Sequence, residues 1–318
     1  MDRFGQLTVC AVCFYDAGLD RRRTESLQML NPIEKADTLI EALGWIRQFR
    51  DKIVVIKLGG SIIDHGDMLR HILLDILFME TVGVRPVVIH GGGARINAAM
   101  EQAGIQPRFV QGRRYTDAQT LEIVERVLAE ETNEYIADQF EKIGGRAMTL
   151  NFKSAPVLYG KKLNLRGENG EDIDLGFVGE VTRVDRLVID NLCYAGQVPF
   201  IPSMCLAEDD QKLNVNADTA ATQLAIELNA EKLVLLSDVP GVMADPKDPE
   251  SLISWLDQDR ATKLIAEGVI SGGMIPKVEA CLDTVKHGVK KVHIVDGRLR
   301  HSLLLEVYTT KGIGTVIS

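Results

Sequence analysis

The sequence predicts an α/β protein, a three-layer α/β/α sandwich in which helices cover both faces of a mostly parallel central sheet. Short apolar runs rich in β-branched residues, such as Ile53–Ile56 and Lys291–Asp296, have the length and composition of buried strands. Segments with helical spacing of apolar residues separate these runs along the chain. Alternating strands and helices favour parallel pairing, since each helix provides the crossover to the next strand. A chain of 318 residues is long enough for one large domain of this kind or two small ones.

The first predicted helix begins at Asn31-Pro32-Ile33-Glu34 and ends at Arg50. Asn can cap a helix, Pro fits the first helical position, and Glu34 reaches back to the cap. Gly44 weakens the middle of this helix and makes a kink plausible there. Later strands are predicted at 53–56, 86–90, 198–202, 232–237 and 291–296, and later helices at 68–81, 94–103, 117–142, 219–228, 260–267 and 278–287. The polar, glycine-containing segment Lys161–Val184 is predicted to form hairpins.

Composition excludes several classes of protein. The formal net charge of −9 argues against nucleic acid or an anionic membrane as a partner. The sequence contains no apolar run approaching the ~20 residues that cross a bilayer. Five scattered cysteines are typical of reduced thiols in a cytoplasmic protein. Cys10 and Cys13 have C-x-x-C spacing, but no second pair completes a zinc site, so no metal site is predicted.

Two glycine turns directly follow predicted strands. Lys57-Leu-Gly-Gly-Ser61 places a lysine beside glycines that let the backbone approach a ligand closely. His90-Gly-Gly-Gly93 leads into a helix whose N-terminal dipole favours an anion. Neither G-x-x-x-x-G-K-[ST] nor G-x-G-x-x-G occurs in the sequence. Taken alone, either turn could simply be a tight or flexible connection, but both fall at the carboxyl ends of strands, where ligands of α/β sheets bind.

Two further motifs carry side chains that could bind an anion or act in catalysis. Arg114 follows Gly112-Arg113 and could hold a carboxylate through two hydrogen bonds, although a solvated surface arginine is the better interpretation of this motif by itself. Asn214-Val-Asn216-Ala-Asp218 would place three polar side chains on one face of an extended segment. Without further context, Asp218 is better interpreted as the N-cap of the helix over 219–228.

A second lysine lies in an unusual position. Lys277 follows Ser271-Gly272-Gly273 at a predicted helix start, where its charge opposes the helix dipole, so a carboxylate or a phosphate should compensate it. The sequence lacks an obvious Ser-His-Asp set and lacks HExxH. Lysines at glycine turns suit phosphoryl transfer, in which positioning and charge neutralisation carry most of the catalysis. A carboxylate acceptor is already ionised at neutral pH and needs no general base.

The chain resembles the amino acid kinase family from about Ile33 to Ile317, and within it the members that phosphorylate N-acetyl-L-glutamate in arginine biosynthesis. The motifs that carry the resemblance, in the family order, are Ile56-Lys-Leu-Gly-Gly60, His90-Gly-Gly-Gly93, Gly112-Arg-Arg-Tyr-Thr-Asp117, Asn214-Val-Asn-Ala-Asp-Thr-Ala-Ala221, Ser237-Asp-Val-Pro-Gly241 and Gly273-Met-Ile-Pro-Lys277. The family often has an apolar residue where Arg113 stands, which leaves the choice between Arg113 and Arg114 open. The first 30 residues have no counterpart, and Gly44-Trp45 replaces a more usual Pro-aromatic pair.

The resemblance implies a role for each motif. Lys57 and Lys277 would stabilise the transferring phosphoryl group, and Asp218 would hold both lysines in place. N-acetyl-L-glutamate would be bound by Gly92, Gly93, Arg114 and Asn214. ATP, carrying its own Mg²⁺, would be bound by Gly59, Gly60, Ser237, Asp238, Gly241 and Met243. The implied product is the acyl phosphate N-acetylglutamyl 5-phosphate.

The resemblance also implies regulation and assembly. Lys232, His293, Glu306 and Gly312 would bind L-arginine as a feedback inhibitor, although the same residues could merely close the last strand. The helix over 31–50 resembles the one that interlaces dimers into a hexamer, and a PII-type protein is a possible further partner. The implied organisation is an extension at 1–30, the oligomerisation helix at 31–50, an acceptor lobe at 51–229 and a nucleotide lobe at 230–318.

Three alternatives stay open. A sister kinase could act on an aminoadipate-type acceptor, glutamate, carbamate or uridylate. A protein of this fold could be a non-catalytic arginine sensor, but the presence of Lys57, Asp218 and Lys277 argues against that. A dinucleotide-dependent oxidoreductase is disfavoured because the G-x-G-x-x-G turn is absent.

Overall fold

The computed structural model describes residues 32–166, 170–245, 247–272, 274–309 and 312–318. The predicted extension at 1–30, with Cys10 and Cys13, lies outside the described residues, as does Gly273. The chain divides into two compact units, Met1–Leu43 and Gly44–Ser318. The central sheet and the candidate site both belong to the second unit.

Helix α1 (Pro32–Phe49) crosses the boundary between the units and agrees with the predicted helix to within one residue at each end. In the first unit, the side chains of Leu39 and Ile40 are each 70% exposed. In the second unit, the ring of Trp45 stacks on that of Phe49, with centroids 6.0 Å apart. Phe49 is buried in the core. The last turn of α1 is therefore part of the folded second unit.

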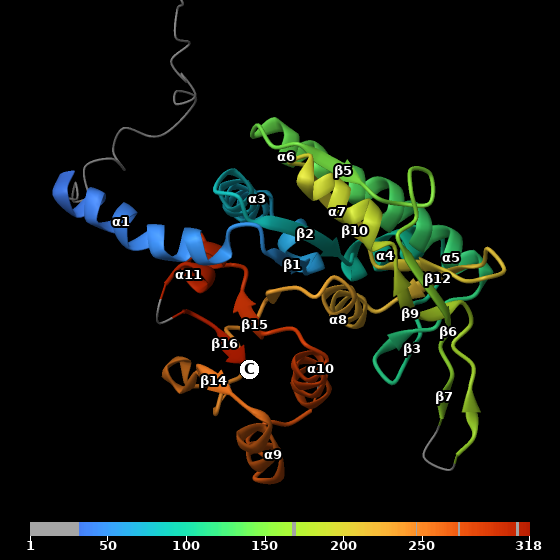
Figure 1. Ribbon diagram of the computed structural model, residues 1–318. Helices are drawn as coiled ribbons and strands as arrows, with labels where there is room; N and C mark the ends of the chain where they lie inside the picture. The colour runs from blue at the N-terminus through green and yellow to red at the C-terminus, as the bar shows by residue number, and fades with distance from the viewer. Residues whose placement is uncertain (1–31, 167–169, 246, 273, 310–311) are drawn as a thin grey trace, which may run out of the picture. The chain divides into compact units, whose positions relative to one another are not determined.

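An eight-stranded sheet forms the centre of the second unit, as predicted (Figure 1). Its strand order is β14-β16-β15-β13-β1-β2-β10-β5. The strands span Trp255–Leu256, Thr315–Ile317, Lys291–Asp296, Lys232–Ser237, Ile53–Leu58, Arg85–His90, Val198–Pro202 and Ala147–Thr149, in that order. All neighbouring strands run parallel except β15 and β16. The sheet runs without interruption from strands before residue 230 to strands after it.

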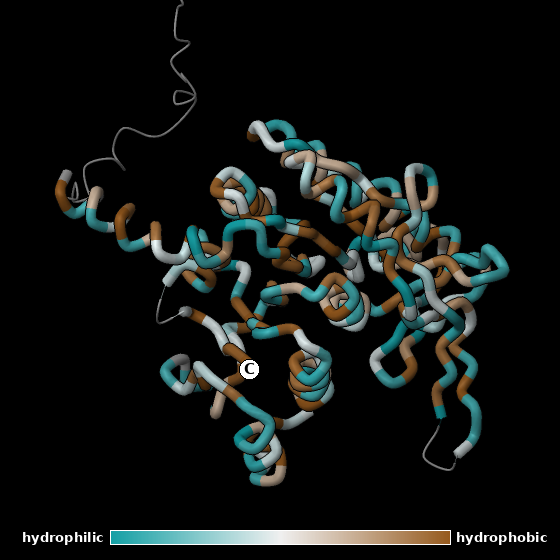
Figure 2. Tube along the Cα trace, viewed as in Figure 1, coloured by the Kyte–Doolittle hydropathy of each residue, from teal (hydrophilic) through white to brown (hydrophobic). Residues whose placement is uncertain are grey.

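Helices cover both faces of this sheet, which confirms the predicted three layers. Successive residues of β1 point to opposite faces, so Val54 and Ile56 pack in one apolar core and Ile53 and Val55 in another. The first core is covered by α3 (Gly66–Thr81), α6 (Asn133–Lys142) and α11 (Ser302–Val307), and the second by α7 (Arg186–Tyr194), α8 (Ala217–Glu227) and α10 (Met274–Lys286). Figure 2 shows apolar residues concentrated along the central strands.

Smaller elements lie outside the eight-stranded sheet. Strands β6 (Leu158–Lys162), β9 (Val178–Val184), β11 (Met204–Leu206) and β12 (Lys212–Val215) close into a small barrel. The antiparallel pair β6 and β9 confirms the hairpin predicted over Lys161–Val184. The remaining short elements are α2 (Gly60–Ile63), α4 (Gly93–Gln102), β3 (Phe109–Val110), β4 (Arg113–Arg114), α5 (Ala118–Glu125), β7 (Leu165–Arg166), β8 (Asp172–Ile173), η2 (Pro249–Ser251) and α9 (Gln258–Ala266).

The helix predicted over 117–142 is interrupted in its middle. It consists of α5, a π-helical segment η1 (Arg126–Thr132), and α6. A π-helical turn holds one more residue than an α-helical turn, and such segments are frequent at functional sites. No helix in the described part of the chain is both long and apolar enough to cross a bilayer.

Candidate active site

The two glycine turns meet at one edge of the sheet. Strands β1 and β2 pair in parallel with Leu58 opposite His90, so both turns leave the sheet at the same level. A Cβ added to Gly60 would lie 3.5 Å from the backbone nitrogen of Gly93. The structure therefore brings Gly59-Gly60 and Gly91-Gly92-Gly93 together into one site at the carboxyl ends of the strands.

The carboxylate of Asp218 lies between two lysines from different elements. Its Oδ1 is 2.9 Å from Nζ of Lys57, near the end of β1. Its Oδ2 is 3.6 Å from Nζ of Lys277, in the first turn of α10. This contact confirms the prediction that an anion compensates the lysine at the start of that helix. Burial by itself would raise the pKa of Asp218, but the charges of Lys57 and Lys277 outweigh it and hold the pKa below its usual value.

Asp218 reaches the lysines because it is not the N-cap of α8, and that prediction was wrong. The cap is Asn216, whose Oδ1 accepts hydrogen bonds from the backbone nitrogens of Asp218 and Thr219 at 3.0 and 3.1 Å. The expected extended segment from Asn214 to Asp218 was also wrong, since β12 ends at Val215 and α8 begins at Ala217. Because Asn216 satisfies the first amides of α8, the Asp218 carboxylate is free to contact both lysines.

Arg114 is a buried cation with neutral partners. Its side chain donates hydrogen bonds to Oδ1 of Asn97 at 2.7 Å and to the carbonyl of Gly93 at 3.3 Å. Its guanidinium carbon lies 4.9 Å from the ring centroid of Phe109. The residue is 8% exposed, so the interpretation as a solvated surface arginine was wrong. Burial lowers its pKa, and within the described residues no carboxylate forms an ion pair with it. A buried charge without a counter-charge is costly unless a ligand supplies one.

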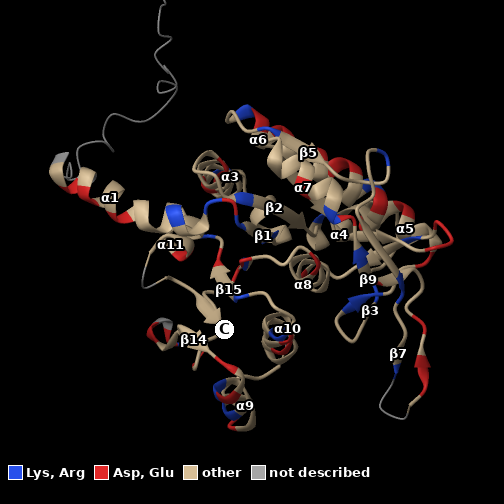
Figure 3. Cartoon of the chain, in the orientation of Figure 1, with Lys and Arg blue, Asp and Glu red and all other residues tan. Residues whose placement is uncertain are grey.

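Asn214 is joined to the same part of the site through Thr116. The amide nitrogen of Asn214 donates to Oγ1 of Thr116 at 3.1 Å, and that hydroxyl donates to the carbonyl of Arg114 at 3.0 Å. Thr116 is fully buried and was missed in the sequence. The one sequence feature that could have identified Thr116 is its place in the motif that contains Arg113 and Arg114. The hairpin β3–β4 that carries both arginines is basic (Figure 3).

The residues predicted to bind the nucleotide lie at the neighbouring strand end. Ser237 is the last residue of β13, and its hydroxyl donates to Oδ1 of Asp238 at 3.4 Å. A Cβ on Gly59 would lie 3.2 Å from the carbonyl oxygen of Leu236, so this strand end is next to the first glycine turn. Gly241 has φ 149°, and a Cβ there would lie 2.6 Å from Oγ1 of Thr315. Met243 pairs with Leu252 in an isolated antiparallel bridge.

Residues 52–296 match the model of the amino acid kinase family. The chain belongs to the amino acid kinase family. It is 45% identical over 293 residues to the acetylglutamate kinase of Heliobacterium modesticaldum, covering 91% of this chain and 99% of the relative. It is 44% identical over 291 residues to the acetylglutamate kinase of Moorella thermoacetica, covering 91% and 98% of the two chains.

Solved structures with the same fold include N-acetylglutamate synthase from Neisseria gonorrhoeae complexed with coenzyme A and N-acetyl-glutamate. Its TM-score is 0.75 at 24% identity, and the match covers 89% of this kinase. This kinase spans 63% of the length of that synthase. At this identity the likeness shows the fold alone.

A second cluster of polar side chains in this kinase is buried at the other end of β13. His293 Nδ1 lies 2.6 Å from Oε1 of Glu306, and Nζ of Lys232 lies 3.4 Å from His293 Nε2. Gly312 has φ 63°, and a Cβ there would lie 2.9 Å from Oε2 of Glu306. Lys232 is the first residue of β13 and Ser237 the last. At ~3.3 Å per residue, the cluster is therefore roughly 16 Å from the nucleotide turn.

Burial and hydrogen bonding together shift the pKa values of the side chains in this cluster. Burial lowers the pKa of Lys232 to about 8 and also lowers the pKa of His293, which is therefore neutral at neutral pH. Burial alone would raise the pKa of Glu306, but the hydrogen bond from His293 and the backbone nitrogens of Ile313 and Gly314 hold it below its usual value. The structure thus brings the four predicted arginine-binding residues of this kinase together, and their role stays a prediction.

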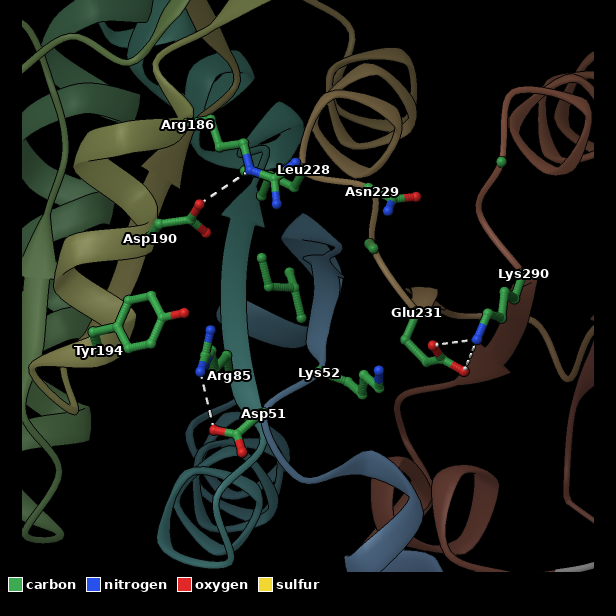
Figure 4. Close-up of a pocket in the computed structure, with 13 residues that line it drawn as sticks. Asp51, Lys52, Arg85, Arg186, Asp190, Tyr194, Leu228, Asn229, Glu231 and Lys290 are labelled. Carbon is green, nitrogen blue, oxygen red and sulfur yellow. Dashed lines mark hydrogen bonds and ion pairs between the residues drawn. The ribbon is translucent and has the colours of Figure 1, made fainter.

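A cavity of about 240 Å³ lies away from the glycine turns, at the amino ends of β1, β2 and β13 (Figure 4). Three ion pairs line it, Arg85 with Asp51, Arg186 with Asp190 and Lys290 with Glu231. The guanidinium carbon of Arg85 also lies 3.9 Å from the ring centroid of Tyr194. Since these charges largely neutralise one another, the cavity differs in character from the cationic glycine-turn site.

Proposed function

We propose that this chain transfers the γ-phosphoryl group of ATP to the side-chain carboxylate of N-acetyl-L-glutamate. The observation that carries the proposal is the Lys57–Asp218–Lys277 arrangement beside the two glycine turns. Relatives that are 41–45% identical over most of their length bear the name acetylglutamate kinase, which supports this acceptor. The product would be N-acetyl-L-glutamyl 5-phosphate. Its formation is the step that an acetylglutamate kinase catalyses in arginine biosynthesis.

The bond changes require little chemistry from the protein. A carboxylate oxygen of the acceptor forms a bond to the γ-phosphorus while the bond to the bridging oxygen breaks, and ADP leaves with that electron pair. The side-chain carboxyl of the acceptor has a pKa of about 4.3 in water and is already ionised at neutral pH, so no residue has to remove a proton. Lys57 and Lys277 then neutralise the charge on the transferring group from two elements, and Asp218 fixes the positions of both.

The acceptor is proposed to lie between the second glycine turn and Arg114. Backbone nitrogens of Gly92 and Gly93, at the N-terminus of α4, would face its negative charge. The Arg114 guanidinium, buried without a carboxylate among the described residues, would pair with its α-carboxylate. Asn214, joined to Arg114 through Thr116, would bind the amide.

The glycine turn after β1, together with the adjacent end of β13, fits a nucleotide phosphate chain. A Cβ on Gly59 or Gly60 would meet backbone atoms, so the absence of side chains leaves room for phosphates, and Lys57 lies beside Gly59. Mg²⁺ supplies additional charge neutralisation when it is bound to the phosphates. Across the described residues, no three His, Cys, Asp or Glu side chains converge in a way that could hold a metal ion. We propose that Mg²⁺ arrives bound to the phosphates of the nucleotide.

Hydroxylamine traps acyl phosphates as hydroxamates, which gives a direct test. The protein is incubated with MgATP, N-acetyl-L-glutamate and hydroxylamine, and hydroxamate is measured against a mixture without acceptor. Hydroxamate that depends on N-acetyl-L-glutamate supports the proposal. If only L-glutamate or L-aminoadipate gave hydroxamate, or if only carbamate or uridylate gave ADP, the acceptor assignment would be wrong.

We also propose that L-arginine inhibits the enzyme by binding at the Lys232–His293–Glu306 cluster. The Glu306 carboxylate packs so closely against Gly312 that a Cβ there would lie 2.9 Å from its Oε2, and this carboxylate would attract a guanidinium. Hydroxamate formation that falls as L-arginine is added supports the proposal, with L-lysine as the matched cation. Hydroxamate formation that is indifferent to L-arginine would leave the kinase activity intact and remove the regulatory role.

The predicted hexamer and the PII-type partner also remain proposals. The exposed side chains of Leu39 and Ile40 on α1 support the hexamer.

A further inference from the structure

The imidazole of His90 joins the second glycine turn to helix α6. His90 is the last residue of β2 and is fully buried. Its Nδ1 lies 3.3 Å from the carbonyl oxygen of Gly91, and its Nε2 lies 3.2 Å from the side-chain oxygen Oδ1 of Asn133, the first residue of α6. Asn133 is also fully buried. Neither residue was selected as a site residue from the sequence, although His90 belongs to the turn motif itself.

The ring can satisfy both contacts in only one neutral form. Burial lowers the pKa of His90 to about 4, so the imidazole is uncharged at neutral pH and carries one proton. The carbonyl of Gly91 can only accept, so that proton must be on Nδ1. Nε2 must then accept a hydrogen bond from the NH₂ group of Asn133. In the orientation that the structure has, Oδ1 of Asn133 faces Nε2 and Nδ2 is buried without a partner; turning the amide over, which interchanges its nitrogen and oxygen, gives Nδ2 the ring as its acceptor.

The π-helical segment supports the turn from the same side. A Cβ on Gly92 would lie 2.6 Å from Cδ2 of Leu128, which lies within η1. Gly92 has φ −168°, which any residue adopts, so the glycine is required by this packing and not by its backbone conformation. Asn133 directly follows η1, and the wider π-helical turn changes which way the next residue faces. Leu128 thus supports Gly92 by packing. Asn133 supports Gly91 indirectly, because it contacts His90, which in turn contacts the carbonyl of Gly91.

We propose that His90 and Asn133 are positioning residues that hold Gly91–Gly93 in the conformation that presents its backbone nitrogens to the acceptor. This inference rests on the proposed function, in which Gly92 and Gly93 bind the acceptor carboxylate. A displacement of this turn would also disturb Gly60, because Gly93 N lies 3.5 Å from the Cβ position of that residue. A misplacement of ~1 Å in such a site can cost roughly 10²-fold in rate.

Two substitutions of His90 separate its two contacts. His90→Asn retains an NH₂ group near the position of Nδ1 and can still donate to Gly91, whereas His90→Gln retains one only near Nε2. We expect His90→Gln, which loses the hydrogen bond to Gly91, to raise the acceptor KM by roughly tenfold or more with a smaller change in the KM for ATP. His90→Asn and Asn133→Leu both lose only the contact between the ring and the Asn133 amide, so we expect each to raise the acceptor KM by a similar and smaller factor. Equal acceptor KM values in all three variants would overturn the proposal.

A core substitution controls for loss of stability. Phe140→Leu, about two turns further along α6, removes packing against Phe200 without touching the turn. It should lower Tm and leave both KM values unchanged. If it raised the acceptor KM as much as Asn133→Leu did, the effect would be general loosening of α6, and the positioning role would be wrong.

The proton on the ring can be located without turnover. ¹⁵N NMR of the labelled full-length protein at pH 7, with the His90 signals assigned by their absence in His90→Asn, should show a neutral ring protonated at Nδ1. Protonation at Nε2 would overturn the proposed hydrogen-bond arrangement. Because this measurement needs no activity, it remains decisive even if the wild-type protein forms no hydroxamate and the proposed function fails.

Discussion

The carboxylate oxygen Oδ1 of Asp218 lies 2.9 Å from the ammonium nitrogen of Lys57. The two residues are far apart in the sequence and come from α8 and β1, which pack directly on each other. Asp218 also contacts Lys277 through its other oxygen. One carboxylate therefore fixes two cations whose mutual repulsion would otherwise separate them.

Asp218→Asn should lower kcat by roughly 10²-fold, because both lysines lose the charge that positions them. Asp283→Asn, an exposed position on α10, serves as the matched control and should retain wild-type activity. Since the pKa of Asp218 lies below 3.8, its stabilising ion pairs are complete above that pH and are lost only as pH falls through the lowered value. The kcat of the wild type should accordingly show no loss from Asp218 protonation between pH 5 and 8.

Lys277→Ala should lower kcat by roughly 10²–10³-fold, because charge on the transferring phosphoryl group is no longer neutralised from the α10 side. The KM for the acceptor should change much less, since Lys277 acts on the group in transfer. Steady-state kinetics with varied N-acetyl-L-glutamate measures both values. Near-normal turnover would remove Lys277 from the mechanism.

Arg114→Ala should raise the KM for N-acetyl-L-glutamate by roughly 10–10²-fold, because the acceptor loses its charge partner. Arg113→Ala is the matched control, since this neighbour is half-buried on the same strand and makes none of the Arg114 contacts. The pair of variants also decides which arginine of the motif binds the carboxylate. The opposite pattern, with the larger KM effect in Arg113→Ala, would reverse the assignment.

Lys232→Met should stabilise the fold at pH 7. The folded pKa of Lys232 is about 8 because burial disfavours its charge, whereas the unfolded value is 10.5. Below pH 8 the folded protein carries this cost in full, and the cost disappears as pH rises from 8 to 10.5. A gain on the order of 2 kcal/mol is expected at pH 7, shrinking toward zero near pH 10.

Urea unfolding of Lys232→Met and wild type at both pH values measures that difference. Lys290→Met, at an exposed lysine, is the control and should show no such pH dependence. A gain that was equal at pH 7 and pH 10 would mean that Met packs better than Lys, and that charge burial is not the cause.

Removal of residues 1–43 should leave an active protein of smaller assembly size. The cut follows the boundary between the two units and spares Phe49, which is buried in the core of the second. If α1 joins dimers into a hexamer, sedimentation should show dimers for the truncated chain and hexamers for the full one. A truncated chain that still sedimented as a hexamer would refute this role of the helix.

The local sequence determined the layer architecture and most of its elements. Strands over 198–202, 232–237 and 291–296 have the predicted bounds, because a short segment of mostly apolar residues fits a strand buried on both faces. The order of strands and helices then requires a mostly parallel sheet. The glycine turns were predicted for the same reason, since each follows a recognisable strand.

Only the tertiary structure decided what the polar residues do. Asp218 and Asn216 are both good N-cap residues, and the chain's path determined that Asn216 caps α8 while Asp218 reaches two lysines. Arg114 has an ordinary sequence context, yet packing buries it against Phe109 and Asn97. Burial, ion pairing and the His90–Asn133 contact depend on groups distant along the chain. A pattern of neighbouring residues does not specify the distance between side chains that are far apart along the chain. The motifs could therefore be recognised in the sequence, whereas the contacts of their side chains depend on the fold.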